Sequence, residues 1–160
     1  RAYARDCLTY AGFAAAMLPL GLAGWASGWR PGRGWTIAVS AVPPVAAAVL
    51  AAAQESGPVC ATPGKRRHGL AVAAAAGDQP VSFGRALARN LIKITVPWQV
   101  GHVVAIGAAG GWFDDRDPVT LWSTAALYPL LGTWAWFLLR RPGRTIHDRV
   151  TGTRVLTTAQ

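Results

Sequence analysis

The chain has few charged residues and few cysteines. Only 14% of its 160 residues are charged, and 52% are hydrophobic; an average soluble domain has roughly 25% charged residues. This composition favours an integral membrane protein over a soluble globular one. The two cysteines, Cys7 and Cys60, are far apart in the sequence and form no Cys-x-x-Cys pair. We therefore expect both to be free thiols.

The motifs of catalysis and of metal or cofactor binding are also missing. The sequence has no nucleophile elbow and no carboxylate pair suited to general acid–base chemistry. Gly64-Lys65 is not followed by the Ser or Thr of a phosphate-binding loop. Cys7, Cys60, His68 and His147 do not follow a zinc-ligand spacing. We predict that the protein is not an enzyme and has neither a metal site nor a cofactor.

Four long apolar stretches dominate the sequence, at about residues 7–29, 35–53, 94–113 and 119–139. Each is close to the roughly 20 residues that cross a bilayer, and the first is too long for a signal peptide. Two short polar loops join them in pairs. We predict an all-α integral membrane protein with four transmembrane helices in two hairpins, as one domain over residues 1–160. A soluble all-α core is the alternative, and four such runs count against it. Because residue 1 is Arg, we expect further sequence before it.

Basic residues predict the orientation of the hairpins. All but three of the 16 Lys and Arg residues lie at the N-terminus, in the connector at 54–93 or in the tail at 140–160. The positive-inside rule places these segments and both termini in the cytoplasm. The preference for Arg over Lys is typical of a GC-rich bacterial genome, so we expect a bacterial plasma membrane. The net charge of +9 then indicates topology and anionic lipid rather than nucleic acid.

The connector contains an amphipathic segment. Ser82 is a suitable N-cap for a helix that continues to Lys93, with Arg85, Arg89 and Lys93 at four-residue spacing. We predict an interfacial helix that binds lipid headgroups; a soluble helix packed on the connector is the alternative. Arg140 and Arg141, at the start of the tail, are predicted to bind headgroups as well.

A small cytoplasmic β element is predicted from the connector and the tail. Gly69–Ala74 can form a short strand, and Thr153–Thr157 alternates in polarity as a strand does. Between the fourth apolar stretch and this second strand, Thr145–Val150 can form a short helix that Gly152 ends. We expect the two strands to pair.

Small residues and prolines lie within the apolar stretches. Gly24-x-x-x-Gly28 and Gly107-x-x-x-Gly111 have the spacing that allows close contact between membrane helices, although glycine is common throughout this chain. Pro43-Pro44 removes backbone hydrogen bonds, which neighbouring groups must replace in lipid. We favour simple kinks at these prolines over a ligand site.

His102 is the only ionisable residue within the predicted spans, and Gln99 lies on the same helix face. Ionisable residues within a membrane are functional candidates, so these two form an alternative proton or ion site. A histidine that is hydrogen-bonded across helices is the favoured reading. No carboxylate lies within the predicted spans, which counts against cation transport because a cation in low dielectric needs a counter-charge.

Three sequence pieces together resemble the RDD family of bacterial membrane proteins. They are Ala61-Thr62-Pro63-Gly64-Lys65-Arg66, Ser82-Phe83-Gly84-Arg85-Ala86 with Arg89-Asn90, and Ile146-His147-Asp148-Arg149. The resemblance implies a multi-pass membrane protein, with cation/proton antiport as the activity of some members. In the family pattern, Asp148 matches a late aspartate, whereas Leu8 stands where a buried first-helix aspartate is expected, and Asp6 lies at the membrane edge.

Charged residues of the three pieces and of the N-terminus are expected to meet at the cytoplasmic rim. We predict a structural charge cluster in which Asp148 pairs with a cation, made up of Arg1, Arg5, Asp6, Lys65, Arg66, Asp148 and Arg149. The predicted function is an accessory or stabilising subunit of a larger membrane complex, with other membrane subunits and anionic lipid as partners. A small transporter, such as a cation/proton antiporter, is the alternative.

Overall fold

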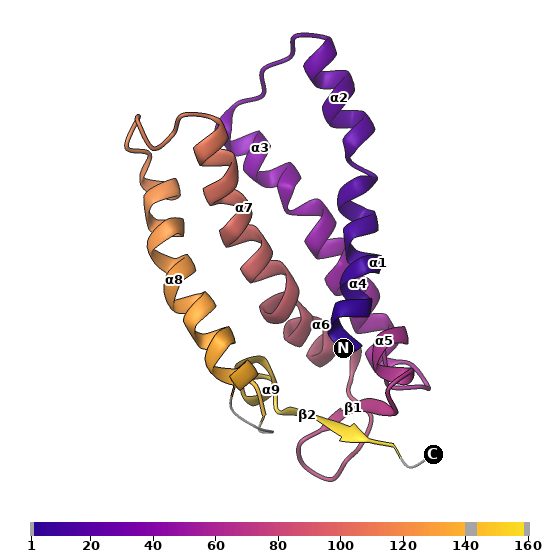
Figure 1. The fold of residues 1–160 in the computed structure, drawn as a ribbon. Helices are drawn as coiled ribbons and strands as arrows, with labels where there is room; N and C mark the ends of the chain where they lie inside the picture. Colours follow the sequence, from indigo (N-terminus) through magenta and orange to yellow (C-terminus); the bar gives the residue numbers. More distant parts are fainter. Residues whose placement is uncertain (1, 140–143, 159–160) are drawn as a thin grey trace.

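The structure is a computed structural model that describes residues 2–139 and 144–158, and it is mostly helical with one small sheet (Figure 1). Long helices run side by side, and the short elements lie together at the end where both termini are found. The elements in chain order are α1 Ala2–Ala15, α2 Leu18–Ala26, α3 Arg33–Ser40, α4 Val42–Ser56, α5 Pro63–Arg66, β1 Leu70–Ala74, α6 Phe83–Asn90, the π-helical turn η1 Leu91–Thr95, α7 Val96–Ala109, α8 Pro118–Leu139, α9 Ile146–Val150 and β2 Thr153–Thr157.

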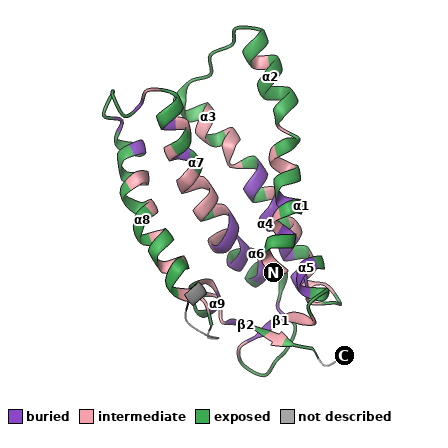
Figure 2. Ribbon diagram, viewed as in Figure 1, coloured by how far each residue is buried: buried purple, intermediate pink, exposed green. Residues whose placement is uncertain are grey.

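Within residues 2–139 and 144–158, three helical segments are long and apolar enough to cross a membrane. They cover Ala2–Ala26, Arg33–Ser56 and Phe83–Ala109, and each is a run of consecutive helices. Much of their surface is exposed (Figure 2), which is the arrangement of helices that face lipid. α8 has 22 residues and no charged side chain, but its Trp, Tyr, Ser and Thr residues lower its hydropathy and it is not among the three.

Prolines interrupt the second long segment, and neighbouring side chains compensate. Ala41 N–H bonds to the Ala38 carbonyl, one residue short of the α-helical partner, between α3 and α4. The Ile37 carbonyl instead accepts a hydrogen bond of 3.0 Å from Gln99 Nε2 of α7. Thr95 Oγ1 of η1 donates to the Pro44 carbonyl at 3.1 Å, which ties η1 to α4. Gln99 of α7 therefore satisfies the Ile37 carbonyl that the break frees.

The predicted interfacial helix is part of the third long segment. Ser82 caps it as expected, because its side chain accepts the Arg85 N–H. The helix does not end near Lys93, however, but continues through η1 into α7. At η1 the Val96 N–H bonds to the Leu91 carbonyl in the π pattern, which accommodates Pro97 without ending the helix. This corrects the prediction of a separate helix that precedes the third span.

The sheet forms as predicted. β1 and β2 pair antiparallel, with Leu70 opposite Thr157 and Ala74 opposite Thr153. α9 precedes β2, and the positive φ of Gly152 lies between them, as expected for a glycine that ends a helix. The connector and the tail thus form one small unit at the end of the long helices.

Small residues set the distances between the long helices. One face of α4 is buried through Ala47, Ala48, Ala51 and Ala52. On α7, a Cβ at Gly107 would lie 2.5 Å from Thr120 Cγ2 of α8, so only glycine allows this contact. Gly107 therefore has the predicted packing role, whereas Gly28 and Gly111 have open space where a Cβ would lie and Gly24 meets only the nearby Trp29.

Candidate functional site

Buried polar side chains gather where α4, α5, α6 and α9 meet. We use the name charge cluster for five of them: Glu55, Lys65, Arg89, Asn90 and Asp148. Glu55 and Asn90 are 0% exposed, Arg89 is 2% exposed, and Asp148 and Lys65 are 4% and 6% exposed. Such burial of charged groups is rare in proteins unless they are paired.

Glu55 is the centre of the charge cluster. It lies in the last turn of α4 and accepts hydrogen bonds from Lys65 Nζ at 2.7 Å and from Asn90 Nδ2 at 2.8 Å. Arg89 Nη1 lies 3.0 Å from both of its carboxylate oxygens. Thr62 is the N-cap of α5 and helps to hold Lys65 in place. One carboxylate thus binds the side chains of two other helices.

Asp148 completes the charge cluster from the tail. Its Oδ1 lies 2.8 Å from Arg89 Nε and accepts a hydrogen bond of 3.0 Å from Thr153 Oγ1. Its Oδ2 accepts a hydrogen bond of 2.5 Å from Thr145 Oγ1. Arg89 therefore bridges Glu55 on α4 and Asp148 on α9, and it ties the tail to the long helices.

Burial and charge shift the pKa values on α9. Burial raises the pKa of Asp148, but the Arg89 guanidinium and the hydrogen bond from Thr145 lower it more, so the net pKa is below its ordinary value. Burial, together with nearby Arg89, lowers the pKa of His147 to about 4. At neutral pH, Asp148 is thus ionised and His147 is neutral.

Asp6 forms a second buried contact beside the charge cluster. This residue of α1 is 3% exposed and accepts hydrogen bonds from Thr62 Oγ1 at 2.6 Å and from Gly64 N–H at 2.8 Å. A Cβ at Gly64 would lie 2.3 Å from the Ala2 carbonyl oxygen, so the glycine allows α5 to approach α1. Asp6 is therefore a buried carboxylate in the first helix. Because Leu8 stands where the family pattern has its aspartate, the sequence had left such a carboxylate in doubt.

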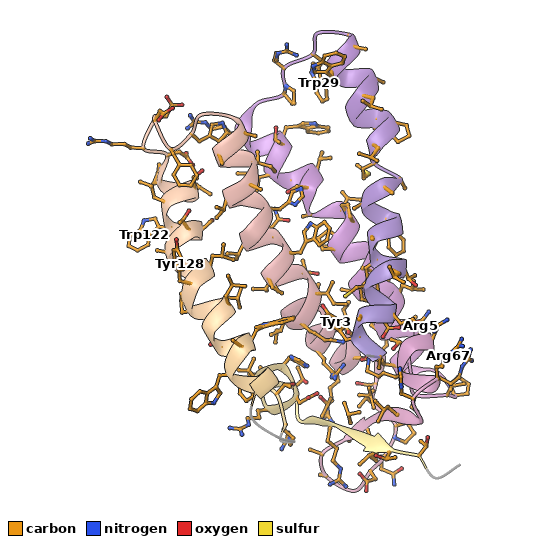
Figure 3. The ribbon with its side chains drawn as sticks, viewed as in Figure 1. Tyr3, Arg5, Trp29, Arg67, Trp122 and Tyr128 are labelled. Carbon is orange, nitrogen blue, oxygen red and sulfur yellow. The ribbon has the colours of Figure 1, made fainter. Side chains whose placement is uncertain are left out.

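Other members of the predicted cluster lie elsewhere. Arg5, Arg66 and Arg149 are exposed, and Arg1 lies outside the described residues. Figure 3 shows Arg5 and Arg67 close together on the outside of α1 and α5. On the single turn of α5, Lys65 is buried, whereas Arg66 is exposed to solvent.

The residues predicted to bind headgroups also separate. Arg85 is exposed, whereas Arg89 belongs to the charge cluster and Lys93 is 7% exposed. The four-residue spacing predicts a basic stripe on the helix surface. In the structure Arg89 and Lys93 are buried instead, Arg89 through its ion pair in the charge cluster and Lys93 on η1. Arg140 and Arg141 lie outside the described residues.

Gln99 and His102 do not form a common site. Gln99 Nε2 bonds to the Ile37 carbonyl and to Ser40 Oγ at 2.9 Å, so its contacts are with α3. His102 is exposed and stacks on Trp98, with 5.4 Å between the ring centroids. Within residues 2–139 and 144–158, no three His, Cys, Asp or Glu side chains form a group that could hold a metal ion, and Cys7 and Cys60 are free.

Similarity to known protein families identifies the group to which the chain belongs. The model of the RDD family matches residues 8–152, which is most of the chain. The chain belongs to the RDD family. Family membership and the apolar helices together make it a membrane protein. Searches of curated proteins and of solved structures returned no match.

The three sequence pieces that resemble the RDD family meet in the structure. The first supplies Lys65, the second Arg89 and Asn90, and the third Asp148. Sequence reasoning missed Glu55, which lies outside all three pieces and binds residues from two of them. A signal was present: Glu55 is the only glutamate in the chain, and it lies two residues after the end of an apolar span. A lone carboxylate at that position needs a basic partner.

Proposed function

We propose that this RDD protein is a non-enzymatic accessory or stabilising subunit of a larger bacterial membrane complex. In this proposal α8 is the fourth span, the four spans form two hairpins, and both termini are cytoplasmic. The basic connector and tail support that orientation. The observation that carries the proposal is the exposed face of α8.

The exposed face of α8 has a composition that suits protein better than lipid. Tyr128 lies at the middle of the helix and is 71% exposed (Figure 3). In membrane helices, tyrosine is enriched at the two interfaces, where its hydroxyl can reach water. At the middle of a span, the Tyr128 hydroxyl needs a hydrogen-bond partner that hydrocarbon cannot supply.

Small residues accompany Tyr128 along this face. An exposed stripe, here called the α8 stripe, consists of Leu121, Ala125, Tyr128, Gly132 and Ala135. Its steps of three and four residues keep it on one side of the helix. Small side chains let another membrane helix approach closely, and this contact is the usual one in lipid. We assign the α8 stripe to a transmembrane helix of a partner subunit.

The charge cluster supports a structural role for the cytoplasmic end. Both carboxylates of the cluster are engaged by cations and by neutral donors, so the pairs fix the geometry of four elements. Exposed Arg85 is available to anionic headgroups at this end. The protein would therefore present a rigid basic end together with a helix face for its partner.

Co-purification from native membranes in mild detergent tests the accessory role. We expect a membrane protein to co-elute in stoichiometric amount with the wild-type chain, and to be lost from Gly132→Leu, which blocks the α8 stripe. Leu20→Phe is the matched control, because Leu20 is 67% exposed on α2 and lies outside the stripe. Recovery of the wild-type chain without a partner, or equal recovery of a partner with Gly132→Leu, would refute the proposal.

A transporter is the second candidate, and Glu55 is the observation that favours it. This carboxylate lies in the second candidate span and is 0% exposed, so a buried carboxylate is present where the sequence indicated none, and a transported cation would have to compete with Lys65 and Arg89 for it. Proteoliposomes that hold the isolated protein and a pH-sensitive dye test this activity. A cation-driven response that is absent in Glu55→Gln, and retained in a His102→Ala control, would place transport above the accessory role.

A further inference from the structure

A pocket lies beside the charge cluster, between the cytoplasmic ends of α1 and α8 as oriented above. Its volume is about 310 Å³, which is at the small end of the range of roughly 300–1,000 Å³ for ligand sites. Three aromatic side chains form its apolar walls: Tyr3 of α1 and Trp134 and Phe137 of α8. Tyr3 and Trp134 are in contact, with 6.2 Å between their ring centroids.

The polar part of the pocket is predominantly positive. Lys65, Arg89 and Lys93 line it, while Asp148 is the carboxylate among the described lining residues. The oxygens of Asp148 are engaged by Arg89, Thr145 and Thr153. Glu55 does not line the pocket. An anion that enters would therefore meet Lys93, with Lys65 and Arg89 nearby, both of which already pair with carboxylates of the charge cluster.

Lys93 is the cation with unused binding capacity. Its Nζ lies 4.4 Å from the centroid of the Tyr3 ring, and in the described part of the chain it has no ion pair or hydrogen bond. Lys65 and Arg89, by contrast, pair with Glu55. Lys93 is only 7% exposed, so it is a buried amino group that lines the pocket and has no anionic partner among the described residues. Buried charges normally have a paired partner.

The local backbone presents Lys93 in this position. The residue lies on η1, a π-helical turn within an otherwise α-helical segment. π turns are rare and are frequent at functional sites. Here η1 shifts the helix register, so that Lys93 lines the pocket while Arg89 remains in the charge cluster.

We propose that this pocket binds the anionic end of one phospholipid molecule, with its phosphate on Lys93 and its apolar part along Tyr3, Trp134 and Phe137. The pocket can enclose a headgroup and the glycerol region but not two acyl chains, which would extend into the bilayer beside α1 and α8. The proposal concerns the isolated chain and does not rest on the accessory role.

Lipid binding to the purified full-length chain in detergent tests the proposal. Native mass spectrometry and thermal unfolding would be recorded with phosphatidylglycerol, phosphatidylcholine or inorganic phosphate. We expect one retained phosphatidylglycerol per chain and stabilisation that exceeds that by phosphatidylcholine. Lys93→Gln should weaken phosphatidylglycerol binding about tenfold, the loss expected for one hydrogen bond to a charged group.

Matched variants distinguish lipid binding in the pocket from electrostatic attraction of lipid to the protein surface. Arg85→Gln removes an exposed cation from the same helical segment and should bind phosphatidylglycerol like the wild type, and Lys93→Arg should restore most of the affinity. Equal weakening by Lys93→Gln and Arg85→Gln would refute the pocket. Complete displacement of phosphatidylglycerol by inorganic phosphate at equal concentration would overturn the lipid assignment in favour of a soluble anion.

A second variant covers the case in which Lys93→Gln does not fold. Trp134→Leu removes part of the apolar wall and lies outside the charge cluster. We expect this variant to remain folded and to bind phosphatidylglycerol several-fold more weakly. Unchanged affinity in folded Trp134→Leu would contradict the proposed location of the lipid.

Discussion

Replacement of Glu55 by Gln tests whether the charge cluster holds together the end of the molecule where both termini lie. The change keeps the size of the side chain but removes the negative charge that faces Lys65 Nζ at 2.7 Å and Arg89 Nη1 at 3.0 Å. Arg89 would still have Asp148 at 2.8 Å, while Lys65 would have only the weaker contact of 3.3 Å with Thr62 Oγ1. The variant therefore leaves one buried cation without a counter-charge.

The size of the effect follows from this geometry. Removal of one partner from a buried ion pair costs about 3–5 kcal/mol, a large part of the roughly 5–15 kcal/mol that stabilises a typical protein. For a chain of this size, about 2–4 °C of melting temperature corresponds to 1 kcal/mol, which gives a decrease of about 6–20 °C. Thermal unfolding of the purified protein in one detergent measures this decrease.

An exposed carboxylate provides the control for Glu55→Gln. Asp115 pairs with Arg33, and their side chains are 61% and 44% exposed; such surface pairs contribute about 0–1 kcal/mol. Asp115→Asn should therefore change the melting temperature little. Equal shifts for the two variants would refute the reasoning, because they would show that the buried pairs of Glu55 contribute no more than a surface contact.

Three further predictions concern residues in and around the charge cluster. Asp148→Asn should cost about 1–3 kcal/mol, less than Glu55→Gln, because the amide oxygen still accepts a hydrogen bond and Arg89 keeps Glu55; a larger loss than that of Glu55→Gln in the same melting assay would contradict this order. Gly64→Ala should separate α5 from α1, since its Cβ would lie 2.3 Å from a backbone oxygen, and faster protease cleavage in the connector would reveal it; a wild-type cleavage rate would show that the close approach is not needed. The free energy of unfolding should fall as the pH decreases from about 6.5 to about 4, because His147 takes up a proton in the unfolded state but not in the folded state, where its pKa is lowered. Below this range the loss continues as Asp148 becomes protonated, since its folded pKa is also lowered. His147→Gln should flatten the upper part of this pH dependence in melting curves, and an unchanged profile would exclude His147 as its source.

Local signals in the sequence predicted much of the fold. Alternation of polarity predicted β2, Gly69–Ala74 was predicted as the strand that pairs with it, and Ser82 predicted the start of α6. Gly107 predicted a close helix contact because only small residues allow it. These features depend on a few adjacent residues, so the sequence alone contains enough information to identify them.

The charge cluster depends on contacts between residues that are distant in the sequence, and those were predicted only in part. The sequence indicated that Lys65 and Asp148 would meet other charges, but it assigned Arg89 to the membrane surface and overlooked Glu55. Glu55 and Arg89 are 34 residues apart, and Arg89 and Asp148 are 59 residues apart. Whether these three side chains meet depends on how α4 packs on α6 and on the π-helical turn η1. A rule based on residue spacing predicts neither of these.

The contact at the end of the molecule opposite the charge cluster has a consequence for how the helices can move. Arg33 pairs with Asp115 and, at 3.0 Å, with Asp117, so it joins the start of α3 to the loop before α8. This contact is partly exposed and weak, whereas the charge cluster is buried. If α7 and α8 rock against α3 and α4, this contact should break before the charge cluster does. High salt would weaken it first, because screening acts most strongly on exposed pairs.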